Sequence, residues 1–328
     1  MKVLVTGGAG YIGSHTCKLL ANLGHTVITY DNLSTGHRQL VKWGDFIYGD
    51  IRDEARLRYA VHKYQPDGLI HFASFISVGE SCSDPGSYYE NNILGSLRIM
   101  QVLRDEGVRP LVVSGSAAVY GLPDMVPVAE TAALNPINPY GRTKLVMEWM
   151  LEDFAQAHKL PWLALRYFNA AGADPSAETG EWHEPETHLI PNVLTAILKG
   201  QKLKVFGTDY PTQDGTCIRD YIHVNDLAWA HVLGLSYLLE NKPSMSINLG
   251  TGSGVSVKEI IRAVEELTDK KVPFLVMPRR PGDPASLVAD PTKAHKILNW
   301  TPEFLNIKDI IATALNWLSL HQENLLHI

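Results

Sequence analysis

The chain has 328 residues, of which 45% are hydrophobic, enough to bury a sizeable core in two domains or one large one. A net charge of -6 argues against a nucleic-acid partner, which requires a basic face. No apolar run reaches the length of a membrane span, and the start is too rich in glycine for a signal peptide. The distant Cys17, Cys82 and Cys217 form neither a disulfide framework nor a zinc site, which predicts a reducing cytoplasm.

Short apolar runs alternate with amphipathic stretches through the first half of the chain. The runs predict strands at 2–6, 26–30, 46–48, 69–72, 111–114 and 162–167. Helical patterns fall at 12–23, 54–64, 88–106 and 140–158. Such alternation predicts an α/β fold, a doubly wound parallel sheet covered by helices on both faces.

The pattern changes after residue 168. Residues 169–188 are rich in Gly, Pro, Asp and Glu and predict a long loop. Beyond it we expect helices at 189–199, 224–239, 257–267 and 307–320, and short strands at 204–206, 246–249 and 274–276. We therefore expect one domain at 1–168 and a smaller α/β domain at 169–328, with some of its segments returning to the first.

A glycine-rich turn connects the first predicted strand to the first helix. It reads TGGAGYIGS, with Gly7, Gly10 and Gly13 spaced three apart. Glycines here allow a tight turn and a close approach to a pyrophosphate, which the helix N-terminus attracts. Asp31 closes the second strand, where a carboxylate accepts hydrogen bonds from ribose hydroxyls and repels a 2′-phosphate. The pattern predicts a Rossmann-type domain over 1–168 that binds NAD rather than NADP.

Tyr140 and Lys144 form a YxxxK pair on one face of a predicted helix. A cation beside a phenol lowers its pKa, which a tyrosine needs if it is to act as a base near neutral pH. Ser116 follows the predicted strand 111–114, at the sheet edge where ligands of parallel sheets bind. We expect these three residues to be catalytic, although each alone is common as a surface or turn residue.

The motifs together resemble the extended short-chain dehydrogenase/reductase family over nearly the whole chain. The general motifs are TGGAGYIG, Ser116, YxxxK and RYFN (166–169). A narrower resemblance, to the nucleotide-sugar 4-epimerases of that family, comes from DNLSTG (31–36), VGES (78–81), YYENN (88–92), GTDYPTQDGTCIRDYIHVNDLA (207–228) and RRPGD (279–283).

The resemblance implies an enzyme that interconverts UDP-galactose and UDP-glucose with tightly held NAD. Tyr140 is then expected to take the proton from the sugar 4-hydroxyl while hydride passes to NAD, giving a transient 4-keto sugar. Lys144 is expected to hold the nicotinamide ribose and to lower the pKa of Tyr140, and Ser116 to steady the substrate oxygen.

The resemblance also implies two sets of binding residues. Those expected to contact the cofactor, besides the glycines, Asp31 and the catalytic three, are Tyr11, Ile12, Asn32, Leu33, Ser34, Thr35, Gly36, Asp50, Ile51, Phe72, Ala73, Ser74, Ile76, Asn91 and Phe168. Those expected to contact the UDP-sugar, besides Ser116 and Tyr140, are Asn169, His188, Leu189, Lys204, Val205, Phe206, Arg219, Arg280, Asp283 and Ser286. Two of these, Arg219 and Arg280, have the charge and fork shape that suit a diphosphate, although Arg219 lies beside Asp220.

Three positions depart from the family pattern. Ile76 stands where a lysine is common, and Ala117-Ala118 follows Ser116 where a threonine is common at the second place. Ser286 stands where some members have a bulky tyrosine near the sugar. The smaller residue supports the hypothesis of additional activity on UDP-N-acetylglucosamine and UDP-N-acetylgalactosamine.

Other interpretations of the function are open at this point. A 4-epimerase of UDP-glucuronate or of a UDP-pentose is the strongest rival. A 4,6-dehydratase needs an acid pair where Ala117 and Ala118 stand, and an NAD-sensing protein without turnover usually lacks the Tyr or the Lys. We expect no metal, because His183 and His188 are five apart with Pro185 between them, which excludes a metal-binding helix. Family members commonly form homodimers through two long helices, here 88–106 and 140–158.

Overall fold

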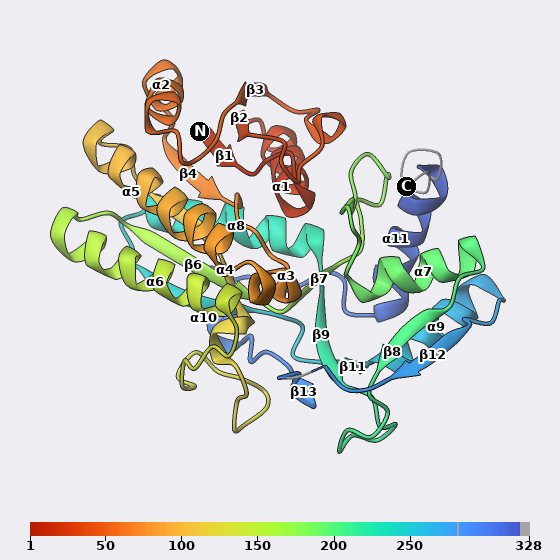
Figure 1. Ribbon diagram of the computed structural model, residues 1–328. Helices are drawn as coiled ribbons and strands as arrows, with labels where there is room; N and C mark the ends of the chain where they lie inside the picture. The colour runs from red at the N-terminus through yellow and green to blue at the C-terminus, as the bar shows by residue number, and fades with distance from the viewer. Residues whose placement is uncertain (281, 322–328) are drawn as a thin grey trace.

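A seven-stranded parallel sheet forms the centre of the molecule in a computed structural model that describes residues 1–280 and 282–321 (Figure 1). The strand order is β10-β6-β5-β4-β1-β2-β3, and every neighbouring pair is parallel. The strands are β1 (Lys2–Thr6), β2 (Thr26–Asp31), β3 (Asp45–Tyr48), β4 (Gly68–His71), β5 (Leu111–Ser116), β6 (Trp162–Tyr167) and β10 (Met245–Leu249). The order reverses between β1 and β4, which is where doubly wound sheets bind ligands. The predicted fold class is confirmed.

Both faces of this sheet are buried under helices. In β1, the side chains of Val3 and Val5 point to one face and that of Leu4 to the other, and all three are inaccessible to solvent. The first face packs against α1 (Tyr11–Asn22), α8 (Val224–Leu239) and α10 (Thr292–Leu298). The second packs against α2 (Glu54–Tyr64), α5 (Gly95–Glu106) and α6 (Pro139–His158).

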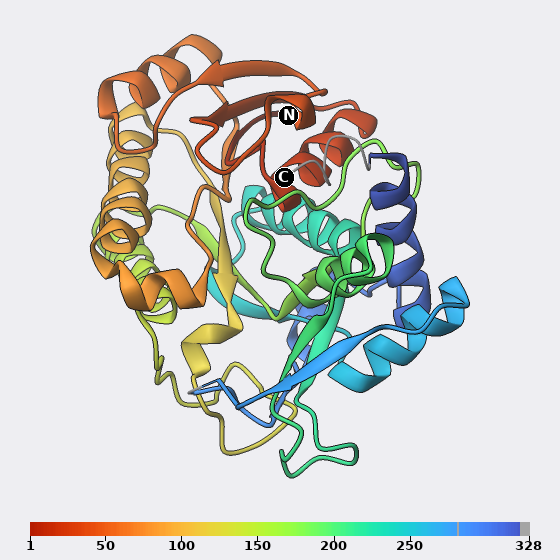
Figure 2. The ribbon, with the colours of Figure 1, turned by 45° about the vertical axis from the view of Figure 1, so that its right-hand side comes forward.

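A second, smaller unit is built from the C-terminal half of the chain (Figure 2). One sheet contains β7 (Asn169–Ala171), β9 (Ile218–His223), β11 (Gly254–Ser256) and β13 (Ser286–Leu287), and β8 (Leu203–Phe206) pairs with β12 (Phe274–Met277). Its core lies among α7 (Leu189–Lys199), α9 (Val257–Thr268) and α11 (Ile307–Leu320). Helices α8 and α10 and strand β10 follow residue 169 in sequence but pack in the first unit.

The expected single helix at 88–106 is wrong in detail. The chain forms α4 (Pro85–Tyr88), then a π-helical stretch, η2 (Tyr89–Leu94), and only then α5. The wider turn directs Asn91 and Asn92 inward, and both are buried. A periodic apolar pattern does not reveal this extra residue per turn.

The expected loop at 169–188 is also corrected at its start, because residues 169–171 form β7. This strand depends on pairing with β9, in the register Asn169 to Tyr221, and local sequence does not reveal that pairing. Elements absent from the expected set are α3 (Val78–Ser83), β9, β11, β13, α10 and the short turns η1 (Arg38–Leu40) and η3 (Ala117–Tyr120). Among the described residues, the helices are too short or too polar to cross a membrane.

Candidate active site

The glycine turn between β1 and α1 brings backbone against backbone. A Cβ on Gly13 would lie 2.1 Å from the carbonyl oxygen of Gly7, and one on Gly7 would lie 2.5 Å from the amide nitrogen of Ala73. Gly7 also has a positive φ of 76°, which favours glycine. Helix α1 begins at Tyr11 with Gly10 as its N-cap, so no side chain caps the first N–H groups. These N–H groups and the helix dipole suit a pyrophosphate.

Asp31 lies at the end of β2 beside this turn. Its carboxylate accepts hydrogen bonds from the backbone N–H groups of Ala9 and Leu33, at 3.0 and 2.8 Å. Burial raises the pKa of Asp31, and these two hydrogen bonds oppose the rise. A fixed carboxylate at this position suits ribose hydroxyls. The next strand end is joined to it, because Asn32 Nδ2 donates to Asp50 Oδ2 at 2.9 Å.

Tyr140 and Lys144 lie in the first turns of α6, which packs across the C-terminal end of β5. The helix begins there because Asn138 accepts a hydrogen bond from the Gly141 N–H and Pro139 occupies the first turn. Ser116, the last residue of β5, lies beside Tyr140, close enough to influence its pKa. The structure therefore brings the three residues expected to be catalytic into one buried group.

Lys144 is fully enclosed and fixed by three oxygen atoms. Its Nζ donates to Ser74 Oγ at 3.0 Å and to the carbonyl and Oγ of Ser114 at 2.9 and 3.0 Å. Burial lowers the pKa of Lys144 to about 7, although the Glu148 charge opposes this. The same Nζ lies 5.9 Å from the centre of the Tyr140 ring.

The expected lowering of the Tyr140 pKa by Lys144 stays a prediction. Burial raises the pKa of Tyr140, and the neighbouring Ser116 side chain partly opposes this rise. Loss of solvent disfavours the charged phenolate directly, which is why burial has the largest effect on this group. A cationic ligand ring beside Tyr140 would supply the missing stabilisation.

Three of the other residues expected to contact the cofactor connect the glycine turn to α6. The end of β4 leads from Phe72 through Ala73, which touches Gly7, to Ser74, which binds Lys144. Of the remainder, Ile12 lies in α1 and Asn91 in η2. The others lie in the segments after β2, β3 and β6: Leu33, Ser34, Thr35, Gly36, Asp50, Ile51 and Phe168. The side chain of Ile51 is buried in the core. That of Ile76 is 44% exposed.

Tyr11 has a second role that its sequence position does not indicate. Its hydroxyl donates to the carbonyl of Gly172 at 2.5 Å, and its ring meets those of His15 and His183 edge-on. Burial raises the pKa of Tyr11, and the negative charges of Glu181 and Glu186 add to the rise. The side chain thus ties the first helix to the segment before α7, while its backbone begins the helix.

The residues expected to contact the sugar nucleotide are spread over the second unit. Arg219 pairs with Asp283 at 3.3 Å and not with its neighbour Asp220, whose carboxylate accepts backbone N–H groups instead. Arg280 lies over the ring of Phe206, 4.0 Å from its centre. The others are Asn169 in β7, His188 and Leu189 at the start of α7, Lys204 and Val205 in β8, and Ser286 in β13. Of these, Val205 has its side chain in the core, so only its backbone can face a ligand.

The sequence motifs missed two residues that organise the site. Ser114 contributes two of the three Lys144 contacts. Asn92 accepts from the Phe75 N–H at 2.8 Å and donates to Thr143 Oγ1 at 3.1 Å, which joins the β4 loop to α6. The position of Ser114 within SGSA, before Ser116, is the signal that could have identified it.

Comparison with known proteins agrees with this geometry. The model of the "NAD dependent epimerase/dehydratase family" matches residues 3–250. A UDP-glucose 4-epimerase of Rhizobium leguminosarum bv. trifolii is 50% identical over 316 residues, which are 96% of each chain. The crystal structure of a UDP-glucose 4-epimerase from Brucella ovis in complex with NAD is 50% identical, with a TM-score of 0.94 over 96% of this chain and 98% of that one.

A more distant structure, the UDP-Glc/GlcNAc 4-epimerase of Campylobacter jejuni, is 36% identical, with a TM-score of 0.84 over 97% of this chain and 99% of that one. The matches thus extend over both structural units and include the glycine turn and the YxxxK helix. The chain belongs to the NAD dependent epimerase/dehydratase family.

Proposed function

We propose that the chain interconverts UDP-galactose and UDP-glucose by oxidising carbon 4 of the sugar and reducing it again on the opposite face. The buried group of Tyr140, Ser116 and Lys144 beside the glycine turn is the observation that carries this proposal. The names of the relatives support the UDP-hexose over a UDP-glucuronate or UDP-pentose substrate. Residues 1–168 are assigned to the cofactor and 169–328 mainly to the nucleotide sugar.

The residues present fit NAD. Side chains at Gly7 or Gly13 would collide with backbone, so these glycines keep the turn tight enough for a pyrophosphate to approach the start of α1. Asp31 would accept hydrogen bonds from the adenine ribose hydroxyls, and Lys144 would donate to the nicotinamide ribose. When bound, NAD supplies the acceptor and donor of hydride.

Tyr140 is the proton acceptor and donor of the reaction. Its oxygen takes the proton of the sugar 4-hydroxyl as carbon 4 loses hydride, which leaves a 4-keto sugar and a neutral phenol. The Ser116 hydroxyl donates a hydrogen bond to the same substrate oxygen. After the keto sugar has turned, hydride returns to its other face and Tyr140 gives the proton back to the 4-oxygen, so the cycle leaves both protein and cofactor unchanged.

The test is conversion of UDP-galactose to UDP-glucose by the purified protein without added NAD, followed by chromatography. Tyr140→Phe should lower the rate by about 10²–10⁴-fold, the usual contribution of a positioned acid–base group, and should still bind NAD. Tyr59→Phe, at a half-exposed tyrosine on α2, is the matched control and should retain activity. Near-normal turnover by Tyr140→Phe, or a stoichiometric need for NAD with a keto product accumulating, would contradict the proposal.

A second substrate pair, UDP-N-acetylglucosamine and UDP-N-acetylgalactosamine, is favoured by Ser286. This small residue lies in β13 opposite Ile218, one position before Arg219 in β9. A hydroxymethyl group there leaves room for a 2-acetamido substituent. The Campylobacter jejuni relative is named for both glucose and N-acetylglucosamine forms.

We also infer that two copies associate through the face of α5 and α6. Trp149 on α6, Leu94 in η2 and Val78 in α3 are 54%, 38% and 45% exposed, and α6 packs against both η2 and α3. Apolar side chains exposed on neighbouring elements are typical of an interaction surface. Sedimentation analysis should show a homodimer, and Trp149→Glu should shift it to monomer. The three cysteines are free, and we place the protein in the reducing cytoplasm.

A further inference from the structure

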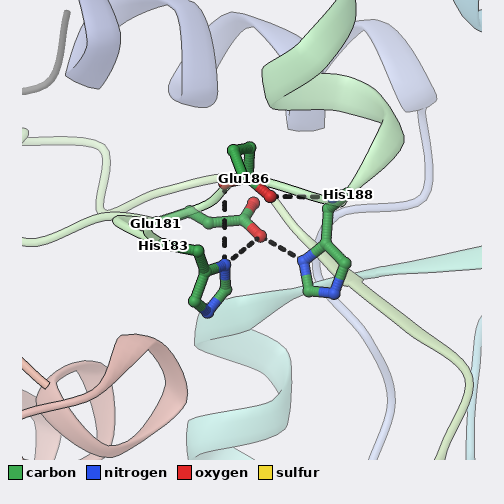
Figure 3. Close-up of side chains that lie close together, drawn as sticks. All are labelled: Glu181, His183, Glu186 and His188. Carbon is green, nitrogen blue, oxygen red and sulfur yellow. Dashed lines mark hydrogen bonds and ion pairs between the residues drawn. The ribbon is translucent and has the colours of Figure 1, made fainter. Parts of the chain in front are cut away.

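Four potential metal ligands gather in the segment between β7 and α7. They are Glu181, His183, Glu186 and His188, and one ligand atom from each lies within 4.8 Å of all the others. Figure 3 shows the imidazoles of His183 and His188 on either side of the Glu181 carboxylate, with Glu186 behind. Pro185 does exclude a helix here, as the sequence predicts, but an irregular loop brings the two imidazoles together, which a helix with this spacing would not do.

The donor atoms face one another. His183 Nδ1 lies 3.2 Å from Glu181 Oε1 and 3.6 Å from Glu186 Oε2, and His188 Nδ1 contacts the same Oε1 of Glu181. His183 Nδ1 is hidden from solvent, yet its direction gives a hydrogen bond to neither carboxylate. A nitrogen that points between two carboxylate oxygens is oriented as a metal ligand is.

The surrounding structure holds these side chains in place. Glu186 Oε1 accepts the backbone N–H groups of Thr187 and His188, both at 2.7 Å, which leaves Oε2 for the cluster. The carbonyl of Glu181 accepts from Trp317 Nε1 at 3.0 Å, and Asn192 Nδ2 donates to the carbonyl of His188 at 2.7 Å. Such outer contacts orient the ligands of protein metal sites.

We propose that this cluster binds one divalent cation of the zinc type, with two imidazole nitrogens and two carboxylate oxygens as ligands. This donor set suits Zn²⁺ or Co²⁺, whereas Mg²⁺ and Ca²⁺ prefer oxygen alone. In a tetrahedral zinc site, ligand atoms are roughly 3.4 Å apart, so a pair at the 4.8 Å limit would need to close by roughly 1.4 Å. Because Tyr11 packs on His183 and Trp317 binds Glu181, the ion would join the start of α1 to α7 and α11.

The test is metal content of the whole protein after equilibration with Zn²⁺ and gel filtration, with titration calorimetry in parallel. We expect one Zn²⁺ per chain, with little binding of Mg²⁺. His183→Gln and His188→Gln should each lower the Zn²⁺ affinity at least tenfold, and His62→Gln, an exposed histidine on α2 with 81% of its side chain accessible, should leave it unchanged.

Crystals of the unaltered protein grown with Zn²⁺ provide a second readout that does not depend on the variants folding. Anomalous scattering at the zinc edge should place the ion among the four side chains. Failure to bind Zn²⁺ at one per chain, retention of wild-type affinity by the His183→Gln/His188→Gln double variant, or an anomalous peak elsewhere would each overturn the proposal. If the four side chains form only ion pairs with one another, the protein will fail to bind one Zn²⁺ per chain.

Discussion

Arg166 and Glu148 form a buried, two-pronged ion pair that joins β6 to the middle of α6. Arg166 Nε donates to Glu148 Oε1 at 2.9 Å, Nη2 donates to Oε2, and the two side chains are 5% and 3% exposed. Arg166 Nη1 also donates to the Tyr120 hydroxyl at 2.9 Å. Because α6 carries Tyr140 one turn before Lys144 and Lys144 one turn before Glu148, this pair sets the position of the helix that carries the catalytic residues.

Removing one partner of this ion pair should lower the free energy of unfolding. Glu148→Ala leaves a buried guanidinium without its countercharge, and we expect the free energy of unfolding to fall by about 3–5 kcal/mol. Glu148→Gln keeps the shape of the side chain and one oxygen acceptor for Arg166, so its free energy of unfolding should fall by less. Glu152→Gln, one turn further along α6 and exposed, should change stability by less than about 0.5 kcal/mol. Urea unfolding followed by circular dichroism measures all three, and equal midpoints for Glu148→Ala and Glu152→Gln would rule out a structural role for the pair.

The buried Lys144 should lower the free energy of unfolding at neutral pH. Burial lowers its pKa from 10.5 to about 7, so between these values the unfolded chain holds the proton more tightly than the folded one. The cost is therefore fully present at pH 7 and below, shrinks as the pH rises, and is gone near 10.5. Lys144→Met lacks this cost but also lacks three hydrogen bonds. We expect it to be more stable than the wild type by roughly 1–2 kcal/mol at pH 7, and inactive.

The pH dependence of this difference is the sharper measurement. Unfolding curves at pH 6, 7, 8 and 9 should show the advantage of Lys144→Met decreasing steadily above pH 7. Lys202→Met, at an exposed lysine before β8, should differ from the wild type by the same small amount at every pH. A difference between Lys144→Met and the wild type that does not vary with pH would mean that the lysine is fully charged in the fold.

The glycine turn yields a prediction about cofactor binding. In Gly13→Ala the new methyl group would lie 2.1 Å from the Gly7 carbonyl oxygen, so either the turn or α1 must shift. A displacement of about 1 Å is enough to lower turnover by roughly 10²-fold, and NAD affinity should fall with it. Gly86→Ala, in the exposed helix α4, meets no atom closer than 3.7 Å and should bind NAD normally. Calorimetric titration with NAD compares them, and unchanged affinity in Gly13→Ala would refute a pyrophosphate position at this turn.

Local patterns predicted most helices and the main sheet because each has a clear signal. Helix α6 has Asn138 and Pro139 at its start, and β1 and β4 are continuous apolar runs. Strand β9 was missed because its sequence, IRDYIH, contains charged residues. Asp220 in β9 is nevertheless buried, because its carboxylate accepts hydrogen bonds from the backbone N–H groups of Thr251 and Gly252. These donors come near Asp220 only when the chain is folded.

In the candidate site too, some features follow from local sequence and others only from the folded chain. Tyr140, Lys144 and Ser116 were predicted because spacing and strand ends bring them together. The oxygen atoms that hold Lys144 come from β5 and from the end of β4, so they depend on the register of the sheet. The spacing of His183 and His188 predicts no metal-binding helix, and the loop conformation that brings them to Glu181 follows from contacts with α7 and α11.

Ser286 should decide how large a sugar the site accepts. Ser286→Tyr replaces a small side chain by an aromatic ring, one strand away from Arg219. We expect kcat/KM for UDP-N-acetylgalactosamine to fall more than about tenfold, because a filled pocket excludes the acetamido group, while UDP-galactose is affected far less. Ser286→Ala, which keeps the space, should turn over both sugars. Equal losses for the two substrates in Ser286→Tyr would indicate a general disturbance of β13, and an absence of turnover of the acetamido sugar by the wild type would eliminate the second substrate pair.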